Sequence, residues 1–354
     1  YIDGSVGRLY TLRSRTSRKE VCMKAKCIVF PEPRRADVGE IEVPAPGPGQ
    51  LLTKTRLTGV STGTETRVFR GAQEGSAFPL IPGYENLGEV IEAGPDTTLK
   101  PGQRVFVRSH AYDPRKFTTQ WGSQVSHSLT TEGSVIPIPD GVSDERGIYA
   151  KIAGISLHGV KRARVSAGEW AVVVGLGIIG QLVLQHAVAR GASVIGIDVD
   201  EGRLELARAG GAAETLSAQD GDLVGRVAEV TGGGADVAFD ATGRPDILAS
   251  TATLLKSRAW DGDIERCGRL VLQGTLEEPV SIPYMTLFRP EIDLIVPRDC
   301  DTQDMIDSIS LMATDRLHPE VIPAAKFSFT NAAAAYQKLV DRELMRVMFT
   351  WSDS

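Results

Sequence analysis

The sequence predicts an α/β fold of two domains, a β-rich domain followed by a doubly wound parallel sheet. Its 354 residues exceed what one ordinary hydrophobic core organises, so the length alone favours about two domains. Short β-like runs broken by Pro and Gly fill the first part, whereas strands and helices alternate after residue 155.

The β-rich part begins near residue 23 and reaches residue 154. Its apolar runs are short and separated by turn residues, as is typical of an irregular sheet domain. The expected strands are Cys27–Phe30, Gly39–Val43, Leu51–Leu57, Gly88–Glu92, Arg104–Val107 and Val135–Ile138. Residues 1–22 lack the apolar core of a secretory signal, and we interpret them as an extension. A mitochondrial address is the alternative, because the stretch is rich in Arg and contains Ser.

The second part alternates apolar strands with helical patterns, which indicates a parallel sheet covered by helices. The expected strands are Trp170–Val174, Ser193–Asp198, Asp236–Phe239, Gly268–Leu272 and Ile292–Val296, and the expected helices are Ile178–Arg190 and one from Glu201. The final stretch, Phe327–Phe349, contains a helical run at Asn331–Asp341 and a terminal strand that could return to the first domain.

Composition excludes several classes of function. The chain is 42% hydrophobic and 24% charged with a net charge of -6, which is ordinary for a soluble protein, and we expect it in the cytoplasm. The sequence has no dense basic run interleaved with aromatic residues, the pattern typical of nucleic-acid-binding proteins. No apolar run approaches the roughly twenty residues of a membrane span. The cysteines are too scattered for a metal site or a disulfide framework, and they are Cys22, Cys27, Cys267 and Cys300.

A glycine-rich turn follows the apolar strand before residue 175. Gly175, Gly177 and Gly180 form a GxGxxG pattern in which the glycines permit a tight turn, close approach to a pyrophosphate and close packing of helix on strand. Ile178 and Ile179 open the following helix, whose N-terminal amides favour phosphate. This strand, turn and helix predict a dinucleotide site.

Asp198 closes the next strand, about twenty residues after the glycines. A carboxylate there accepts hydrogen bonds from both hydroxyls of an adenosine ribose and repels a 2′-phosphate, so it favours NAD over NADP. Arg203 is the residue that could instead reach a 2′-phosphate. We predict NAD.

With the glycine turn, three further segments resemble the medium-chain dehydrogenase/reductase superfamily. They are Val165–Glu169, Asp240–Gly243 and Gly268–Leu272. The resemblance implies a GroES-like catalytic domain at residues 23–154, completed by about residues 300–354, and a Rossmann domain at residues 155–299. It also implies cofactor contacts at Thr242, Gly274 and Arg346, although Arg346 could also be a plain edge-strand cation.

Zinc-dependent members of this superfamily hold a catalytic metal at three positions, which in this sequence carry Thr62, Tyr84 and Lys151. Neutral hydroxyls bind zinc poorly and a protonated lysine repels it, so we predict no metal. The stretches Ser61–Glu65 and Pro82–Glu85 resemble the branch that contains bacteriochlorophyllide a dehydrogenase. The second half is more similar to sorbitol and threonine dehydrogenases, and for that reason we do not expect a chlorin substrate.

Tyr84 and Lys151 are the candidates to replace the metal. An adjacent ammonium could lower the pKa of the phenol and make Tyr84 a general base, or Lys151 itself could stabilise the oxyanion. The alternative is that Tyr84 fills the vacated space and Lys151 extends to solvent. Thr64 fits a hydroxyl relay, and Glu85 either pairs with a cation near the nicotinamide or is structural.

These residues predict a zinc-independent, NAD-dependent dehydrogenase of a secondary alcohol such as a sugar, cyclitol or polyol. An enone or quinone reductase is the alternative enzyme, and a cofactor-binding protein without activity is the second alternative. The resemblance implies a homodimer or homotetramer. The charged stretch Lys256–Arg266 is longer than the family usually carries and could be a surface loop, an oligomer contact or a lid.

Overall fold

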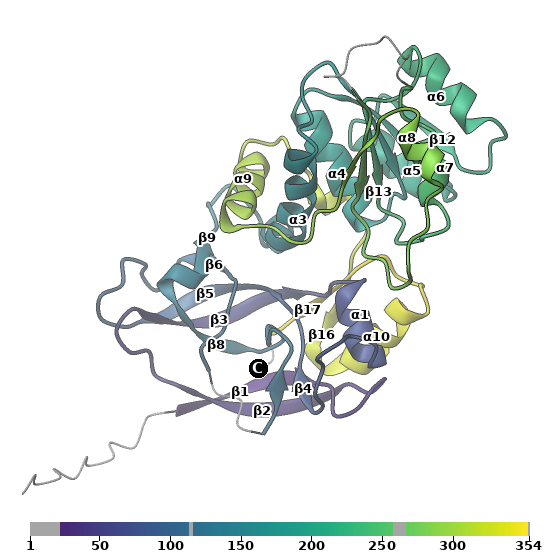
Figure 1. Cartoon of the computed structure of the whole chain (residues 1–354). Coiled ribbons are helices and arrows are strands. Elements are labelled where there is room, and N and C mark those ends of the chain that lie inside the picture. Colours follow the sequence, from purple (N-terminus) through teal and green to yellow (C-terminus); the bar gives the residue numbers. More distant parts are fainter. Residues whose placement is uncertain (1–21, 113–115, 258–266, 353–354) are drawn as a thin grey trace, which may run out of the picture.

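The computed structural model describes residues 22–112, 116–257 and 267–352 and consists of two lobes (Figure 1). The lower lobe in the figure is β-rich, and the upper lobe is a parallel sheet flanked by helices. The fold class predicted from the sequence is therefore confirmed. Residues 1–21 of the expected extension and residues 258–266 of the charged stretch lie outside the described residues.

The lower lobe is built on a seven-stranded sheet in the order β16-β17-β3-β5-β6-β9, with β8 also paired to β3. Its strands are β3 (Gln50–Gly59), β5 (Glu85–Ala93), β6 (Arg104–Val107), β8 (His127–Thr131), β9 (Val135–Pro137), β16 (Ala325–Ser328) and β17 (Val347–Thr350). Two smaller sheets pair β1 (Cys22–Val29) with β2 (Asp37–Pro44), and β4 (Leu80–Ile81) with β7 (Thr118–Thr119). Helices α1 (Thr64–Arg70) and α10 (Ala332–Val340) pack on this lobe.

The last described strand, β17, lies in the same lobe as the first, β1. Strand β17 pairs antiparallel with β3 of the N-terminal half, and the C-terminus lies in the lower lobe of Figure 1. The apolar cluster of this lobe accordingly combines side chains from both ends of the chain, such as Ile28, Phe69, Tyr336 and Phe349. The two ends thus share one hydrophobic core.

The upper lobe contains six parallel strands in the order β12-β11-β10-β13-β14-β15. They are β10 (Trp170–Val174), β11 (Ser193–Asp198), β12 (Glu214–Ser217), β13 (Val237–Asp240), β14 (Arg269–Leu272) and β15 (Asp293–Ile295). Numbered along the chain this order is 3-2-1-4-5-6, the arrangement of dinucleotide-binding domains. Ligands of such sheets bind outside the carboxyl ends of the strands where the order reverses, here between β10 and β13.

Helices cover both faces of this sheet because successive strand residues point to opposite sides. Ala171 and Val173 of β10 pack with α4 and α5, whereas Val172 and Val174 pack with α6, α7 and α8. These helices are α4 (Ile178–Ala189), α5 (Glu201–Ala209), α6 (Leu223–Thr231), α7 (Leu248–Ala252) and α8 (Tyr284–Phe288). No helix among the described residues is long and apolar enough to cross a membrane.

A third group of helices joins the lobes, and the sequence did not reveal it. It comprises α2 (Asp144–Gly147), α3 (Ala150–Arg162) and α9 (Thr302–Ala313). Helix α3 runs through the domain boundary that we expected between residues 154 and 155, and α9 lies beside it (Figure 1). Their apolar side chains pack with Leu87 and Phe106 of the lower lobe and Leu182 of the upper lobe. Single turns of 3-10 helix also occur within the described ranges, at Glu132–Ser134, Pro319–Val321 and Phe329–Asn331.

A buried carboxyl group connects α1 to α10 in the lower lobe. Glu65 is fully buried and accepts hydrogen bonds from the Tyr336 hydroxyl and from Gln124 Nε2 at 3.0 Å. Burial raises the pKa of Glu65 to about 8, and the charge of Glu85 acts in the same direction. Since its pKa is higher in the folded than in the unfolded chain, this group favours folding most below the unfolded value and progressively less as pH rises to about 8.

We therefore predict that the stability of the protein falls between pH 4.5, the ordinary pKa of the group, and pH of about 8, and that Glu65→Gln flattens this dependence. The amide keeps the shape of the side chain but has no charge to desolvate. Chemical denaturation at several pH values measures the effect. An equally steep pH dependence in Glu65→Gln would show that another group controls it.

Candidate active site

A cleft of about 1840 Å³ separates the two lobes and is lined by residues from both. The lower lobe contributes α1 and the segment before β17, and the upper lobe contributes the start of α4 and the loops after β13 and β14. Helix α3 closes the cleft at the junction of the lobes. The cleft thus includes the carboxyl ends of β10 and β13, where ligands of this fold bind.

The glycine turn has the three properties that the sequence suggested. Gly175 has a φ of +86°, and a Cβ there would lie 2.8 Å from the Thr242 side chain. A Cβ at Gly180 would lie 1.9 Å from the carbonyl oxygen of Gly175, so only glycine permits this packing. At Gly177 a Cβ would meet nothing within 4 Å, because this glycine faces the open cleft.

The first turn of α4 is available to an anion. Gly177 caps the helix without a side-chain hydrogen bond, and Gly177, Ile178 and Ile179 all line the cleft. Helix N-terminal amides carry a partial positive charge and bind phosphate. The arrangement fits a dinucleotide pyrophosphate.

Asp198 is anchored at the end of β11. One carboxylate oxygen accepts the amide of Leu176 at 2.6 Å, and the other accepts the amides of Val199 at 2.8 Å and Asp200 at 3.0 Å. Arg203 lines the cleft and lies 3.6 Å from the Asp198 carboxylate. The two residues weighed for cofactor choice are thus neighbours.

Thr242 and Gly274 lie on the cleft wall formed by the loops after β13 and β14. Thr242 donates its amide at 3.0 Å and its hydroxyl at 2.7 Å to Asp240, which fixes the loop. A Cβ at Gly274 would lie 2.7 Å from the amide nitrogen of Gly243, so the two loops touch there. Both residues are placed to contact a bound cofactor.

Arg346 and Glu85 form a fully buried ion pair at 2.6 Å. The expectation that Arg346 is an edge-strand cation is wrong, since its side chain is 0% exposed and lies 4.1 Å from the ring of Tyr149. Nε and Nη1 of Arg346 have no hydrogen-bond partner, and the residue lines the cleft. Glu85 does not line the cleft, and its carboxylate is paired with Arg346.

Tyr84 lies in the cleft wall, with its hydroxyl 2.5 Å from Ser61 Oγ and its ring in edge contact with Trp121. Burial raises the pKa of Tyr84 well above the usual value for a phenol, and the Glu85 carboxylate adds to this effect. Hydrogen bonds with Ser61 and Thr64 oppose it only in part. The structure therefore brings together Tyr84, Thr64 and Ser61.

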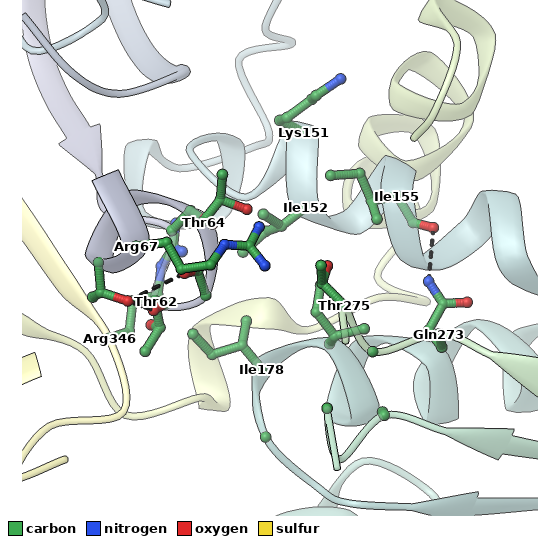
Figure 2. A pocket seen from close by; sticks show the side chains of 18 of the residues that line it. Thr62, Thr64, Arg67, Lys151, Ile152, Ile155, Ile178, Gln273, Thr275 and Arg346 are labelled. Atoms are coloured by element: carbon green, nitrogen blue, oxygen red, sulfur yellow. Dashed lines mark hydrogen bonds between the residues drawn. The ribbon is translucent and has the colours of Figure 1, made fainter. Parts of the chain in front are cut away.

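Lys151 is not the partner of Tyr84. Its ammonium lies 2.7 Å from Asp299 and points away from Thr64 (Figure 2). The expectation that Lys151 lowers the pKa of Tyr84 is wrong. The lysine is paired with the Asp299 carboxylate, and the phenol lies in a partly buried site beside Glu85, which raises its pKa. Lys151 remains on the wall of the same cleft.

The side chains at the three metal positions do not fit a catalytic zinc ion. Thr62 donates its hydroxyl to the Met345 carbonyl at 2.9 Å, Tyr84 is a neutral phenol and Lys151 is a cation. Zinc requires His, Cys or carboxylate donors. Over the described ranges, no group of three or more His, Cys, Asp and Glu is placed to hold a metal ion.

Sequence reasoning did not single out Ser61 or Arg67 as site residues. Ser61 directly precedes Thr62, and Arg67 follows Thr64 by three residues, which places Thr64 and Arg67 on one face of α1. This spacing could have identified Arg67. Ser61 and Arg67 both line the cleft, as does Trp121.

Comparisons with known proteins agree with this geometry. Residues 47–156 match the family model described as the alcohol dehydrogenase GroES-like domain, and residues 179–314 match the one described as zinc-binding dehydrogenase. The chain is 25% identical to 2-desacetyl-2-hydroxyethyl bacteriochlorophyllide A dehydrogenase of Rhodobacter capsulatus, covering 94% of this chain and 100% of the relative. It is also 25% identical to a sorbitol dehydrogenase of Halalkalibacterium halodurans, and this match covers 88% of this chain and 95% of the relative.

A solved structure has the same fold. It is a dehydrogenase from Sinorhizobium meliloti bound to NADP, with a TM-score of 0.80 and 22% identity, covering 93% of this chain and 99% of that one. The family matches cover both lobes, and the relatives extend over nearly the whole chain. The protein therefore belongs to the medium-chain dehydrogenase/reductase superfamily and is an oxidoreductase.

Proposed function

We propose that the protein transfers hydride between a secondary alcohol, such as a sugar, cyclitol or other polyol, and NAD, without zinc. The observation that carries this proposal is the Tyr84 phenol in the cleft, hydrogen-bonded to Ser61 at a position where zinc-dependent relatives hold the metal. The names of relatives such as sorbitol dehydrogenase support an alcohol as substrate. The glycine turn and α4 support a dinucleotide cofactor.

Tyr84 supplies the proton in this proposal. Because its pKa is raised, the phenol is neutral at ordinary pH and donates to a carbonyl oxygen as the alcohol forms. Ser61 and Thr64 orient the phenol through their hydroxyls. In the oxidative direction the same group must first lose its proton, so the site favours ketone reduction near neutral pH.

The chain would hold the cofactor with groups from both lobes. The nicotinamide accepts or donates the hydride when it is bound. The amides at the start of α4 and the two buried, unpartnered nitrogens of Arg346 bind the phosphates, and Thr242 and Gly274 shape the wall. Lys151, held by Asp299, adds positive charge at the side of the cleft and remains a candidate for stabilising the alkoxide.

We predict that Tyr84→Phe lowers kcat by about 10²- to 10⁴-fold, the usual contribution of a general acid, while NADH binding is retained. Turnover of a panel of polyols and their ketones and NADH fluorescence titration measure the two effects. Tyr284→Phe is the control, since Tyr284 is 68% exposed and does not line the cleft. A mild effect of Tyr84→Phe would favour an enone or quinone reductase, and NADH binding without any turnover in the wild type would indicate a non-catalytic protein.

Chelators and metal depletion should leave activity unchanged, because the three ligand positions offer no zinc donor set. Elemental analysis of the purified protein together with rates before and after 1,10-phenanthroline checks this. Loss of activity that zinc restores would overturn the metal-free proposal.

For the cofactor, we expect NAD to bind at least about tenfold more tightly than NADP, a difference of about 1.4 kcal/mol. Asp198→Asn should reduce this preference, since the amide no longer repels a 2′-phosphate. Arg203→Ala should weaken NADP alone. If the wild type prefers NADP, Arg203 and not Asp198 determines the choice.

We also propose a homodimer or homotetramer. Strand β15 is at the edge of the six-stranded sheet among the described strands. Leu294 of this strand is exposed, and so is Phe288 of α8. An edge strand flanked by apolar side chains is suited to pairing with a second copy. Light scattering measures the mass, and a monomer at all concentrations would contradict the proposal. The cytoplasmic location stays a prediction.

A further inference from the structure

Arg67 extends from α1 into the catalytic part of the cleft. It follows Thr64 by three residues, so both side chains are on the same face of α1. Figure 2 shows its guanidinium reaching from Thr64 toward the space beside Thr275 and Ile178, which belong to the opposite wall. A positive charge is thus located between the reacting hydroxyl groups and the upper lobe.

The charge of Arg67 is incompletely compensated. The side chain is only 13% exposed, and its Nε is buried without a hydrogen-bond partner. Glu277 lies 3.9 Å away, and the same carboxylate accepts a closer contact of 3.1 Å from Arg70. Among the residues that the structure describes, Glu277 is the carboxylate within ion-pair distance of either arginine, so two guanidinium groups share one negative charge.

An arginine in this state is prepared for an anion. A guanidinium with an unpaired buried donor loses hydration without a compensating bond, whereas a planar carboxylate or phosphate can satisfy two donors at once. The phosphates of the cofactor have other candidate partners, namely the backbone amides at the start of α4 and the two unpartnered nitrogens of Arg346. Arg67 is on the wall that also carries Thr64 and Tyr84, where the alcohol must bind.

We propose that Arg67 binds an anionic group of the substrate, so that the enzyme acts on alcohols that carry a carboxylate or a phosphate. This inference rests on the proposed dehydrogenase function and narrows its substrate class from polyols in general to sugar acids or phosphorylated polyols. Glu277, which pairs with Arg70 at 3.1 Å, lies beside the Arg67 guanidinium at the edge of the cleft.

The test compares sorbitol, sorbitol 6-phosphate and gluconate as probes of similar length. Calorimetry measures their binding to the protein–NADH complex, and NAD-linked turnover is measured in parallel. We expect either anionic probe to bind at least about tenfold more tightly than sorbitol, because charge-assisted bonds to arginine contribute about 1.5 kcal/mol or more. Arg67→Gln should abolish this difference and leave sorbitol and NADH binding within about twofold.

Arg244→Gln is the matched control, because Arg244 also lines the cleft but pairs with Asp246 at 2.7 Å. It should leave the preference intact. Equal binding of all three probes to the wild type would overturn the proposal. So would a loss of NADH affinity in Arg67→Gln, which would assign the arginine to a cofactor phosphate. Absence of turnover with every probe would count against the proposed function, while the calorimetric preference still decides the role of Arg67.

Discussion

The buried ion pair between Glu85 and Arg346 connects the parts of this molecule on which its chemistry depends. It joins β5 to the segment before β17, and so ties the two ends of the chain together inside one lobe. Removing one partner of such a pair leaves an uncompensated buried charge, which destabilises the folded state by about 3–5 kcal/mol. The same pair acts on the cleft, because Glu85 helps to raise the pKa of Tyr84 and Arg346 keeps two nitrogens without partners.

The site separates two tasks that a zinc ion performs together. A metal polarises the substrate oxygen and also facilitates movement of its proton. In our proposal the proton belongs to the neutral phenol oriented by Ser61, Lys151 supplies positive charge on the cleft wall, and Arg67 binds an anionic group of the substrate. Lys151 is already paired with Asp299, whereas Arg67 shares its carboxylate with Arg70. In our proposal, this division links loss of the metal to the recognition of a charged substrate.

The order of elements was predictable because hydrophobic periodicity and glycine spacing are local properties of the sequence. Five of the six strands of the upper lobe and the turn at Gly175 followed from them directly, whereas strand β12 was not predicted. Helix α9 was missed, although Met305, Ile309 and Met312 have the i, i+4, i+7 spacing of an apolar helix face. Several residues of the cleft wall were predictable from the sequence, but their pairings were not. Tyr84 and Lys151 share the cleft, yet the lysine binds Asp299, which lies 148 residues further along the chain. Such long-range pairings depend on folded geometry that spacing in the sequence does not encode.

In the proposed mechanism, the Tyr84 phenol takes the place of the metal at the reacting oxygen. A crystal structure of the complex with NADH and a bound ketone would show which group contacts that oxygen. We expect the carbonyl oxygen within hydrogen-bond distance of the Tyr84 hydroxyl, with Ser61 as the other partner of the phenol. A metal ion between Thr62 and Tyr84, or a carbonyl oxygen bound only by Lys151, would contradict it.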